Sequence, residues 1–240
     1  MEILEHLRND LHIVHDLNWL GIKGKRQVNQ TANNKSTLYR LYLVTDDQQD
    51  INTLKKVVQK AVQGGVTAVQ IREKHGDVQA FIERAMAVKT ILKGTDVPLI
   101  INDRVDVALA VEADGIHLGQ SDMSVVIARR LVGDNMIIGL SVENEEQLEA
   151  STHLPIDYIG LSAIFSTPTK TNIVKQWGLE GLEHTVKMSP LPVVAIGGIN
   201  QSNIHRVSRT GVDGIAIVSA ICHADDPQLA SQHLLELMKQ

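Results

Sequence analysis

The chain has 240 residues and a formal net charge of -5 at pH 7, with 43% hydrophobic and only 3% aromatic residues. This length suits a single α/β barrel, and the composition predicts a large core filled by aliphatic side chains. The acidic balance argues against a nucleic-acid surface, and no apolar run reaches the roughly 20 residues that a membrane span needs.

Residues 1–38 differ in character from the rest of the chain. Apolar residues recur there with helical spacing up to Leu20, and a polar stretch rich in Lys, Asn, Gln, Ser and Thr follows over 21–37. We predict a helix-and-linker extension over residues 1–38 and a catalytic domain over residues 39–240. Packing of the helix against the bottom of that domain is favoured over a partner-binding role.

From residue 39 onward, short apolar runs alternate with segments of helical period, and continuous apolar runs are typical of buried parallel strands. The runs lie at Leu41–Val44, Ala68–Ile71, Leu99–Ile101, Gly115–Leu118, Ile137–Leu140, Tyr158–Leu161, Val193–Ile196 and Gly214–Val218. Helices are predicted at 54–62, 81–92, 125–131, 145–150, 204–209 and 227–239. The pattern predicts an α/β fold, a single (β/α)₈ TIM barrel with an N-terminal helical extension, and an open doubly wound sheet is the alternative.

Charged residues follow the second predicted strand. Alternation along the strand aims Gln70, Arg72 and Lys74 to one side and Ile71 to the other. Arg offers a bidentate fork and Lys a point charge, so the pair suits an anion at the end of the barrel where active sites are built. A solvated run of charges is the alternative.

Two carboxylates follow the third and fourth strands. Asp103 comes directly after Asn102, and Asp122 lies in the next loop of the same rim. Carboxylate oxygens are ligands of the type that Mg²⁺ uses, especially when phosphates complete its coordination. The structural alternatives are a salt bridge between Asp103 and Arg104, and a helix N-cap role for Asp122.

Hydroxyl groups mark the next two strand ends. Ser141 follows the fifth strand, and it either faces the site or caps the next helix. After the sixth strand, the segment 165–171 contains a run of hydroxyls that ends in Lys170, a composition that suits phosphate binding. The long gap before the next helix predicts a functional loop.

The last two strands end in Gly197-Gly198 and in Val218-Ser219, where barrels often bind a phosphate on backbone N–H groups. Two anion sites on one rim predict a transfer between phosphorylated partners. No Ser-His-Asp, Cys-His or zinc-ligand pattern stands out, and His117 is expected to be packed rather than catalytic. The one cysteine, Cys222, is expected to be a buried thiol and indicates a cytoplasmic location.

Seven segments, in order along the chain, resemble the thiamine phosphate synthase family, also called thiamine-phosphate pyrophosphorylase. They are VQIREK from Val69, IND from Ile101, HLGQSD from His117, GLS from Gly139, STPTK from Ser166, AIGGI from Ala195 and IVSAI from Ile217. The resemblance implies a transferase of thiamine biosynthesis that joins 4-amino-2-methyl-5-(diphosphooxymethyl)pyrimidine to 4-methyl-5-(2-phosphooxyethyl)thiazole. Ionisation of the pyrimidine diphosphate and attack of the thiazole nitrogen would give thiamine phosphate and diphosphate.

The resemblance also implies roles for individual residues. The pyrimidine diphosphate would be held by Gln70, Ile71, Arg72, Glu73, Lys74, Asn102, Ser141 and Lys170. The thiazole phosphate would be held by Thr167, Pro168, Thr169, Gly198, Val218 and Ser219. The implied metal is Mg²⁺, with Asp103 and Asp122 as its ligands. The implied catalytic residues are Arg72, Lys74, Ser141 and Lys170.

Two other functions remain as alternatives. A thiazole tautomerase-like relative shares the barrel and the thiazole phosphate site without needing the metal half, and a non-catalytic thiazole-phosphate-binding barrel is the other. The presence of both Asp103 and Asp122 favours the synthase. Ser162-Ala163 and Ser166 depart from the Gly-Pro and Pro that the family often has around this loop. A homo-oligomer is compatible with the sequence, whereas nucleic-acid and membrane partners are not expected.

Overall fold

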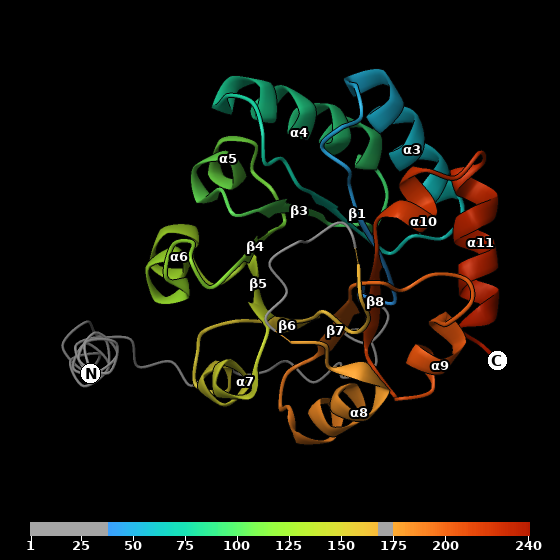
Figure 1. Cartoon of the computed structure of the whole chain (residues 1–240). Coiled ribbons are helices and arrows are strands. Elements are labelled where there is room, and N and C mark those ends of the chain that lie inside the picture. Colours follow the sequence, from blue (N-terminus) through green and yellow to red (C-terminus); the bar gives the residue numbers. More distant parts are fainter. Residues whose placement is uncertain (1–37, 168–174) are drawn as a thin grey trace. The chain divides into compact units, whose positions relative to one another are not determined.

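The computed structural model describes residues 38–167 and 175–240, which form a closed barrel of eight parallel strands (Figure 1). The strands are β1 Leu41–Val44, β2 Ala68–Ile71, β3 Leu99–Asn102, β4 Gly115–Leu118, β5 Ile137–Val142, β6 Tyr158–Ser162, β7 Val193–Ile196 and β8 Gly214–Ile217. β1 pairs with β8, with Leu41 opposite Ile215 and Leu43 opposite Ile217. The predicted barrel is therefore confirmed, and the open sheet is wrong because the pairing of β1 with β8 closes the sheet.

Helices surround the barrel and connect its strands. They are α3 Ile51–Gln63, α4 Val78–Leu92, α5 Val105–Ala110, α6 Val125–Val132, α7 Glu145–Ser151, α8 Gly178–Met188, α9 Ile204–Ser208, α10 Ser219–Cys222 and α11 Pro227–Leu237. The predicted helices are present, but α3 and α4 begin earlier than their apolar periodicity indicated. Asp50 and Asp77 explain the difference, because each carboxylate accepts backbone N–H groups of the first helical turn.

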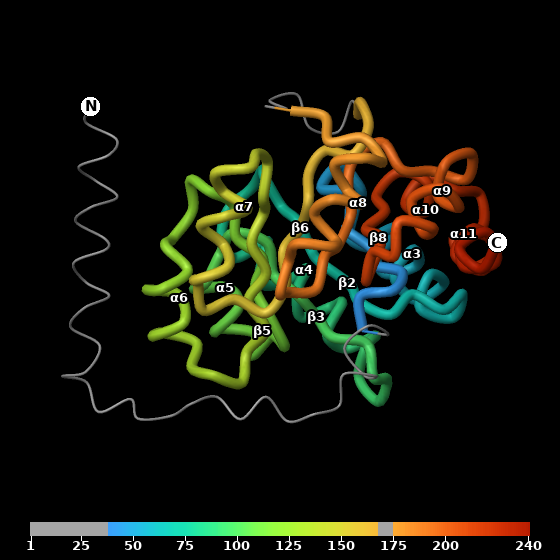
Figure 2. Tube along the Cα trace, turned by 90° about the horizontal axis from the view of Figure 1, so that it is seen from below, coloured from blue at the N-terminus to red at the C-terminus, as the bar shows by residue number. Residues whose placement is uncertain are grey.

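An aliphatic layer fills the space between the strands and the surrounding helices. Strand residues that point outward, such as Leu43, Ile71 and Ile101, are fully buried in this layer. The side view in Figure 2 shows α11 on the same side of the barrel as α9 and α3, and α11 contacts both helices. The helix α11 therefore packs beside α3, the first helix of the described residues.

The interior of the barrel is filled differently. The chain's three tyrosines, Tyr39, Tyr42 and Tyr158, all lie there, and the ring centroids of Tyr39 and Tyr158 are 4.6 Å apart. Gly139 makes room for them, because an added Cβ at this position would lie 2.2 Å from the Tyr158 ring. The expected aliphatic filling is thus confirmed for the outer layer, whereas the interior combines the three tyrosines with aliphatic side chains such as Ile100 and Val194.

The predicted extension over residues 1–38 falls almost wholly on residues 1–37, which lie outside the described part of the chain. Within the described ranges, no helix has the length and apolar character needed to cross a membrane.

Candidate active site

A cavity of about 620 Å³ opens at the carboxyl ends of the strands. Its walls bring together residues from loops and strand ends that are far apart in the sequence. The predicted site residues that line it are Gln70, Arg72, Lys74, Asn102, Asp103, Asp122, Ser141, Thr167, Gly198, Val218 and Ser219. Pro168, Thr169 and Lys170 were also predicted, and they lie outside the described residues.

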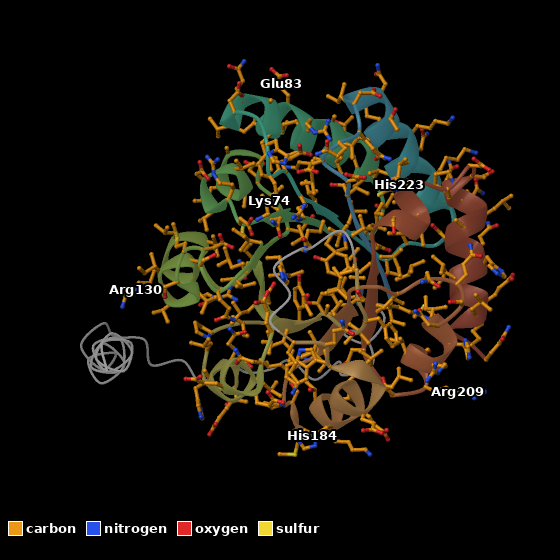
Figure 3. All side chains as sticks on the ribbon, viewed as in Figure 1. Lys74, Glu83, Arg130, His184, Arg209 and His223 are labelled. Carbon is orange, nitrogen blue, oxygen red and sulfur yellow. The ribbon has the colours of Figure 1, made fainter. Side chains whose placement is uncertain are left out.

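Figure 3 shows where one of the lining residues lies relative to the ring of helices. Lys74 lies over the interior of the ring, whereas Glu83, Arg130, His184 and Arg209 lie around its outer surface. The other predicted lining residues also come at or just after strand ends. They lie near one another because the carboxyl ends of parallel strands meet at one rim.

The loop after β1 holds the backbone of the predicted anion clamp. The Arg72 N–H donates to Thr45 Oγ1 at 3.1 Å, and the Lys74 N–H donates to Asp47 Oδ2 at 3.1 Å. Both clamp side chains line the cavity, and the Lys74 ammonium contacts the Asp103 carboxylate. These two residues therefore form part of the site and are not a solvated charge run remote from it.

The side chains of two residues next to the clamp positions face away from the cavity. Ile71 is fully buried in the outer aliphatic layer, and Glu73 pairs with Arg84 at 2.7 Å. Burial raises the pKa of Glu73, and the hydrogen bond and charge of Arg84 oppose that rise. Neither side chain is among the described residues that line the cavity. The side chains of Ile71 and Glu73 therefore support the clamp from behind, and any contact of these two residues with a ligand would come from their backbone atoms.

Asp103 and Asp122 form an acidic pair at the rim. Asp103 has a φ of 63°, which is uncommon for a residue with a side chain, and its N–H donates to His117 O at 2.8 Å. Asp122 Oδ2 accepts the Gly119 N–H at 2.7 Å. Burial raises the pKa of Asp122, and the neighbouring Asp103 raises it further, as expected when two carboxylates share a small volume.

The acidic pair fits a hard divalent cation. Two carboxylates offer the oxygen ligands that Mg²⁺ prefers, and a cation between them would relieve the repulsion that raises the pKa of Asp122. Among the described residues, no group of three or more His, Cys, Asp or Glu side chains is arranged to hold a metal. The remaining ligands of a cation here would therefore come from phosphate oxygens and water.

The structural alternatives for these aspartates are wrong. Arg104 pairs with Asp106, with 2.8 Å between Arg104 Nε and Asp106 Oδ1, and so it is not the partner of Asp103. The N-cap of α6 is Ser124, so Asp122 does not cap that helix. Contacts at the cavity rim, from Lys74 to Asp103 and from the Gly119 N–H to Asp122, therefore orient the two carboxylates.

A polar network on the cavity floor was not predicted from the sequence. Gln70 Nε2 donates to the Tyr42 hydroxyl at 3.0 Å, which lies 2.9 Å from the Tyr158 hydroxyl. His117 Nδ1 lies 2.9 Å from the Tyr158 hydroxyl, and His117 Nε2 lies 2.9 Å from Ser141 Oγ. The network therefore joins Gln70 and Ser141, two predicted ligand-binding residues, through three residues that the prediction did not include.

His117, expected to be packed, also lines this cavity. Gly160 admits its ring, because a Cβ there would lie 2.9 Å from His117 Cε1. Ser141 faces the same network, and the N-cap of α7 is Asn144, so the capping alternative for Ser141 is wrong. Alternation along β4 could have indicated that His117 points inward, but no local pattern indicates its partners.

The wall at β7 and β8 suits a phosphate. Gly198 has a φ of 67°, and an added Cβ would lie 2.4 Å from Ser166 O. Asn203 Nδ2 donates to Gly198 O at 2.9 Å, while the Gly198 N–H donates to no described residue. This amide and the Ser219 hydroxyl both belong to cavity-lining residues, so they can bind the oxygens of a phosphate.

Comparisons with known proteins bear on this arrangement. A family model described as thiamine monophosphate synthase matches residues 41–221. The thiamine-phosphate synthase of Vibrio campbellii is 72% identical over 201 residues, which cover 84% of this chain and 98% of the relative. That of Albidiferax ferrireducens is 51% identical over 200 residues, which cover 83% and 91%. The solved thiamine phosphate pyrophosphorylase from Pyrococcus furiosus is 36% identical, with a TM-score of 0.77 over 86% of this chain and 98% of that chain.

Proposed function

The chain belongs to the thiamine-phosphate synthase family of transferases, and from this premise we propose the reaction that its cavity performs. The substrates are 4-amino-2-methyl-5-(diphosphooxymethyl)pyrimidine and 4-methyl-5-(2-phosphooxyethyl)thiazole, and the products are thiamine phosphate and diphosphate. The observation that supports this proposal is that a clamp of Arg72 and Lys74 and a phosphate wall at Gly198 and Ser219 line the same cavity.

The clamp side of the cavity receives the pyrimidine diphosphate. Arg72 and Lys74 bind the diphosphate oxygens, and Asn102 lies on the same wall. Asp103 and Asp122 would hold Mg²⁺, which supplies a positive charge to the leaving diphosphate when it is bound. Lys74 contacts Asp103, so the cationic and anionic parts of this wall orient each other.

The bond that breaks joins the pyrimidine methylene carbon to the diphosphate oxygen, and its electron pair leaves with the diphosphate. The 4-aminopyrimidine ring donates electrons to the methylene carbon, and the clamp stabilises the charge that develops on the leaving group. The thiazole nitrogen then supplies the electron pair for the new C–N bond. It has no proton to lose, so a strong general base is not required.

The floor of the cavity orients the pyrimidine ring. Gln70 and Ser141 are held by Tyr42, Tyr158 and His117, so their polar atoms are fixed before a ligand arrives. Burial raises the pKa of both tyrosines, and their hydroxyls therefore stay neutral hydrogen-bonding groups. Preorganised groups of this kind lower the cost of orienting a substrate.

The thiazole phosphate occupies the other wall. Gly198 offers its amide and Ser219 its hydroxyl, and Val218 and Thr167 also line this side of the cavity. Lys170 was predicted to act on the diphosphate, and it remains part of the proposal although it lies outside the described residues. A tautomerase-like function is less well supported, because it gives no reason for the acidic pair Asp103 and Asp122 beside the clamp.

A coupling assay tests the proposal. The purified chain is incubated with both substrates and Mg²⁺, and thiamine phosphate and diphosphate are quantified. We expect equal amounts of the two products, and loss of turnover when a chelator removes the metal. The absence of thiamine phosphate above background would reject the synthase assignment, and a product formed from the thiazole substrate alone would support the tautomerase-like alternative.

We also propose a cytoplasmic location. Its support is the single free cysteine, Cys222, which is buried, because reduced thiols are usual in that compartment.

A further inference from the structure

The loop between β1 and α3, residues 45–50, contacts both walls of the cavity. On the clamp side, Thr45 Oγ1 accepts the Arg72 N–H and Asp47 Oδ2 accepts the Lys74 N–H, each at 3.1 Å. Thr45 is 1% exposed, and its own N–H donates to Gln70 O at 2.9 Å. The loop therefore fixes the backbone position of the clamp and of the strand before it.

On the opposite side, the same loop contacts α10. Asp46 Oδ2 lies 2.5 Å from His223 Nε2, and Gln49 Nε2 donates to Cys222 O at 2.7 Å. α10 is a single turn that begins at Ser219, so these contacts hold the far end of the segment that starts in the phosphate wall. Figure 3 shows His223 beside α10, at the side of the ring where β1 meets β8.

A buried ion pair braces the loop from behind. Arg84 Nη1 donates to Gln49 O at 2.8 Å, and Arg84 Nε lies 2.7 Å from Glu73 Oε1. The side chains of Arg84 and Glu73 are 13% and 7% exposed. Because Glu73 lies between the two clamp residues in the sequence, this pair joins α4, the loop and the clamp into one unit.

We propose that the β1–α3 loop sets the spacing between the two anion-binding walls, with Asp46, Gln49 and His223 as positioning residues for the transfer. The inference rests on the proposed function, because it concerns how two substrates are aligned. Each substrate is held by its own phosphate group, while the reacting carbon and nitrogen must approach to about 3–3.5 Å. Each wall can bind its anion alone, but alignment of the two requires that the walls keep their separation.

The test removes the side-chain contacts Asp46–His223 and Gln49–Cys222 without changing a residue that lines the cavity. The double variant Gln49→Ala/His223→Ala should lower kcat by about 10- to 100-fold, because small misplacements of reacting groups are costly. The dissociation constants for inorganic phosphate alone and for pyrophosphate with Mg²⁺ should stay close to those of the parent chain. His153→Ala, which changes an exposed histidine beyond α7, is the matched control and should leave kcat unchanged.

A conservative variant separates positioning from loss of folding. His223→Gln keeps a side-chain donor for Asp46 and should retain most of the kcat that His223→Ala loses. The inference is overturned if the double variant keeps the parent kcat, or if kcat and both dissociation constants worsen together with thermal stability. If the parent chain itself makes no thiamine phosphate, the proposed function and this inference fall together, whereas normal turnover by the double variant overturns the inference alone.

Discussion

Asp103 combines an unfavourable backbone conformation with a specific contact. A left-handed conformation costs about 1–2 kcal/mol for a residue with a Cβ, and Asp is one of the few residues that adopt it. In this position the Asp103 carboxylate meets the Lys74 ammonium and approaches Asp122. Strain of this kind is retained where the direction of a side chain matters, which is consistent with a role in holding a cation.

Replacing this carboxylate should separate turnover from phosphate binding. We expect Asp103→Ala to lower kcat by about 100-fold or more, because preorganised electrostatic groups typically contribute that much to a transition state. Binding of the thiazole phosphate, measured by calorimetry, should change little, since Gly198 and Ser219 lie on the other wall. Asp103→Asn, which keeps the shape and tolerates the same backbone, is the control for strain, and an equal loss of thiazole phosphate binding would show that Asp103 acts structurally.

Cys222 should be chemically inert in the folded chain. Burial raises the pKa of its thiol to about 12, and its Sγ lies 3.6 Å from Val44 O. Because the raised pKa favours the neutral thiol at every pH below that value, little nucleophilic thiolate forms at pH 8. Iodoacetamide should alkylate the native chain slowly at pH 8 and the denatured chain rapidly, as followed by mass spectrometry. Fast alkylation of the native chain would contradict this burial.

The sequence could indicate many of the polar residues that line the cavity, because polar side chains directly follow apolar strands. It could not indicate the partners of His117, since those depend on the register of three separate strands. Likewise, nothing local shows that Tyr42 and Tyr158 meet inside the barrel. The pairing of Glu73 with Arg84 could not be predicted either, because it joins a strand end to a helix face.

At the scale of elements, the turn after β7 depends on its glycine. Gly198 has a left-handed backbone and lies directly against the start of the loop after β6. The Asn203 side chain donates to the Gly198 carbonyl and so fixes the turn. The conformation of this turn then sets the direction of the Gly198 N–H. The phosphate wall is thus a property of how two loops pack.

Gly198→Ala should lose both stability and thiazole phosphate affinity. The added Cβ would lie 2.4 Å from Ser166 O, so the two loops must separate. Gly94→Ala provides a matched control, because Gly94 also has a positive φ of 82° but an added Cβ meets nothing within 4 Å. Both variants should lose about 1–2 kcal/mol of unfolding free energy from backbone strain. Only Gly198→Ala should weaken binding, and equal affinities in calorimetry would argue against this turn as the phosphate site.

The elements themselves were predictable to differing degrees. The strands could be predicted because both of their faces are buried, so they appear in the sequence as continuous apolar runs. The helices α5, α8 and α10 were not predicted, and α10, with four residues, is too short to show a helical period. The first turns of α3 and α4 depend on the capping side chains of Asp50 and Asp77 and have few apolar residues to mark them.

At the scale of the whole molecule, the described cavity is built by residues from Tyr42 to Ser219. We therefore expect a chain that lacks residues 1–37 to keep a kcat near that of the full chain in the coupling assay. Removal of α11 is the contrasting truncation and should abolish folding, because Leu234 is fully buried and α11 packs on α3. A large loss of kcat on deletion of residues 1–37 would indicate an active role for that segment.

Closure of the barrel by β1 and β8 also decides when the enzyme can first work during its own synthesis. β1 leaves the ribosome early, but its second neighbour is residues Gly214–Ile217, near the end of the chain. Until β8 emerges, the nascent sheet has open edges that can pair with other chains. Ser219 lies two residues beyond β8, so the wall proposed to bind a phosphate is completed only after all eight strands have been translated. Ribosome stalling upstream of β8 should therefore yield a nascent chain without activity and dependent on chaperones.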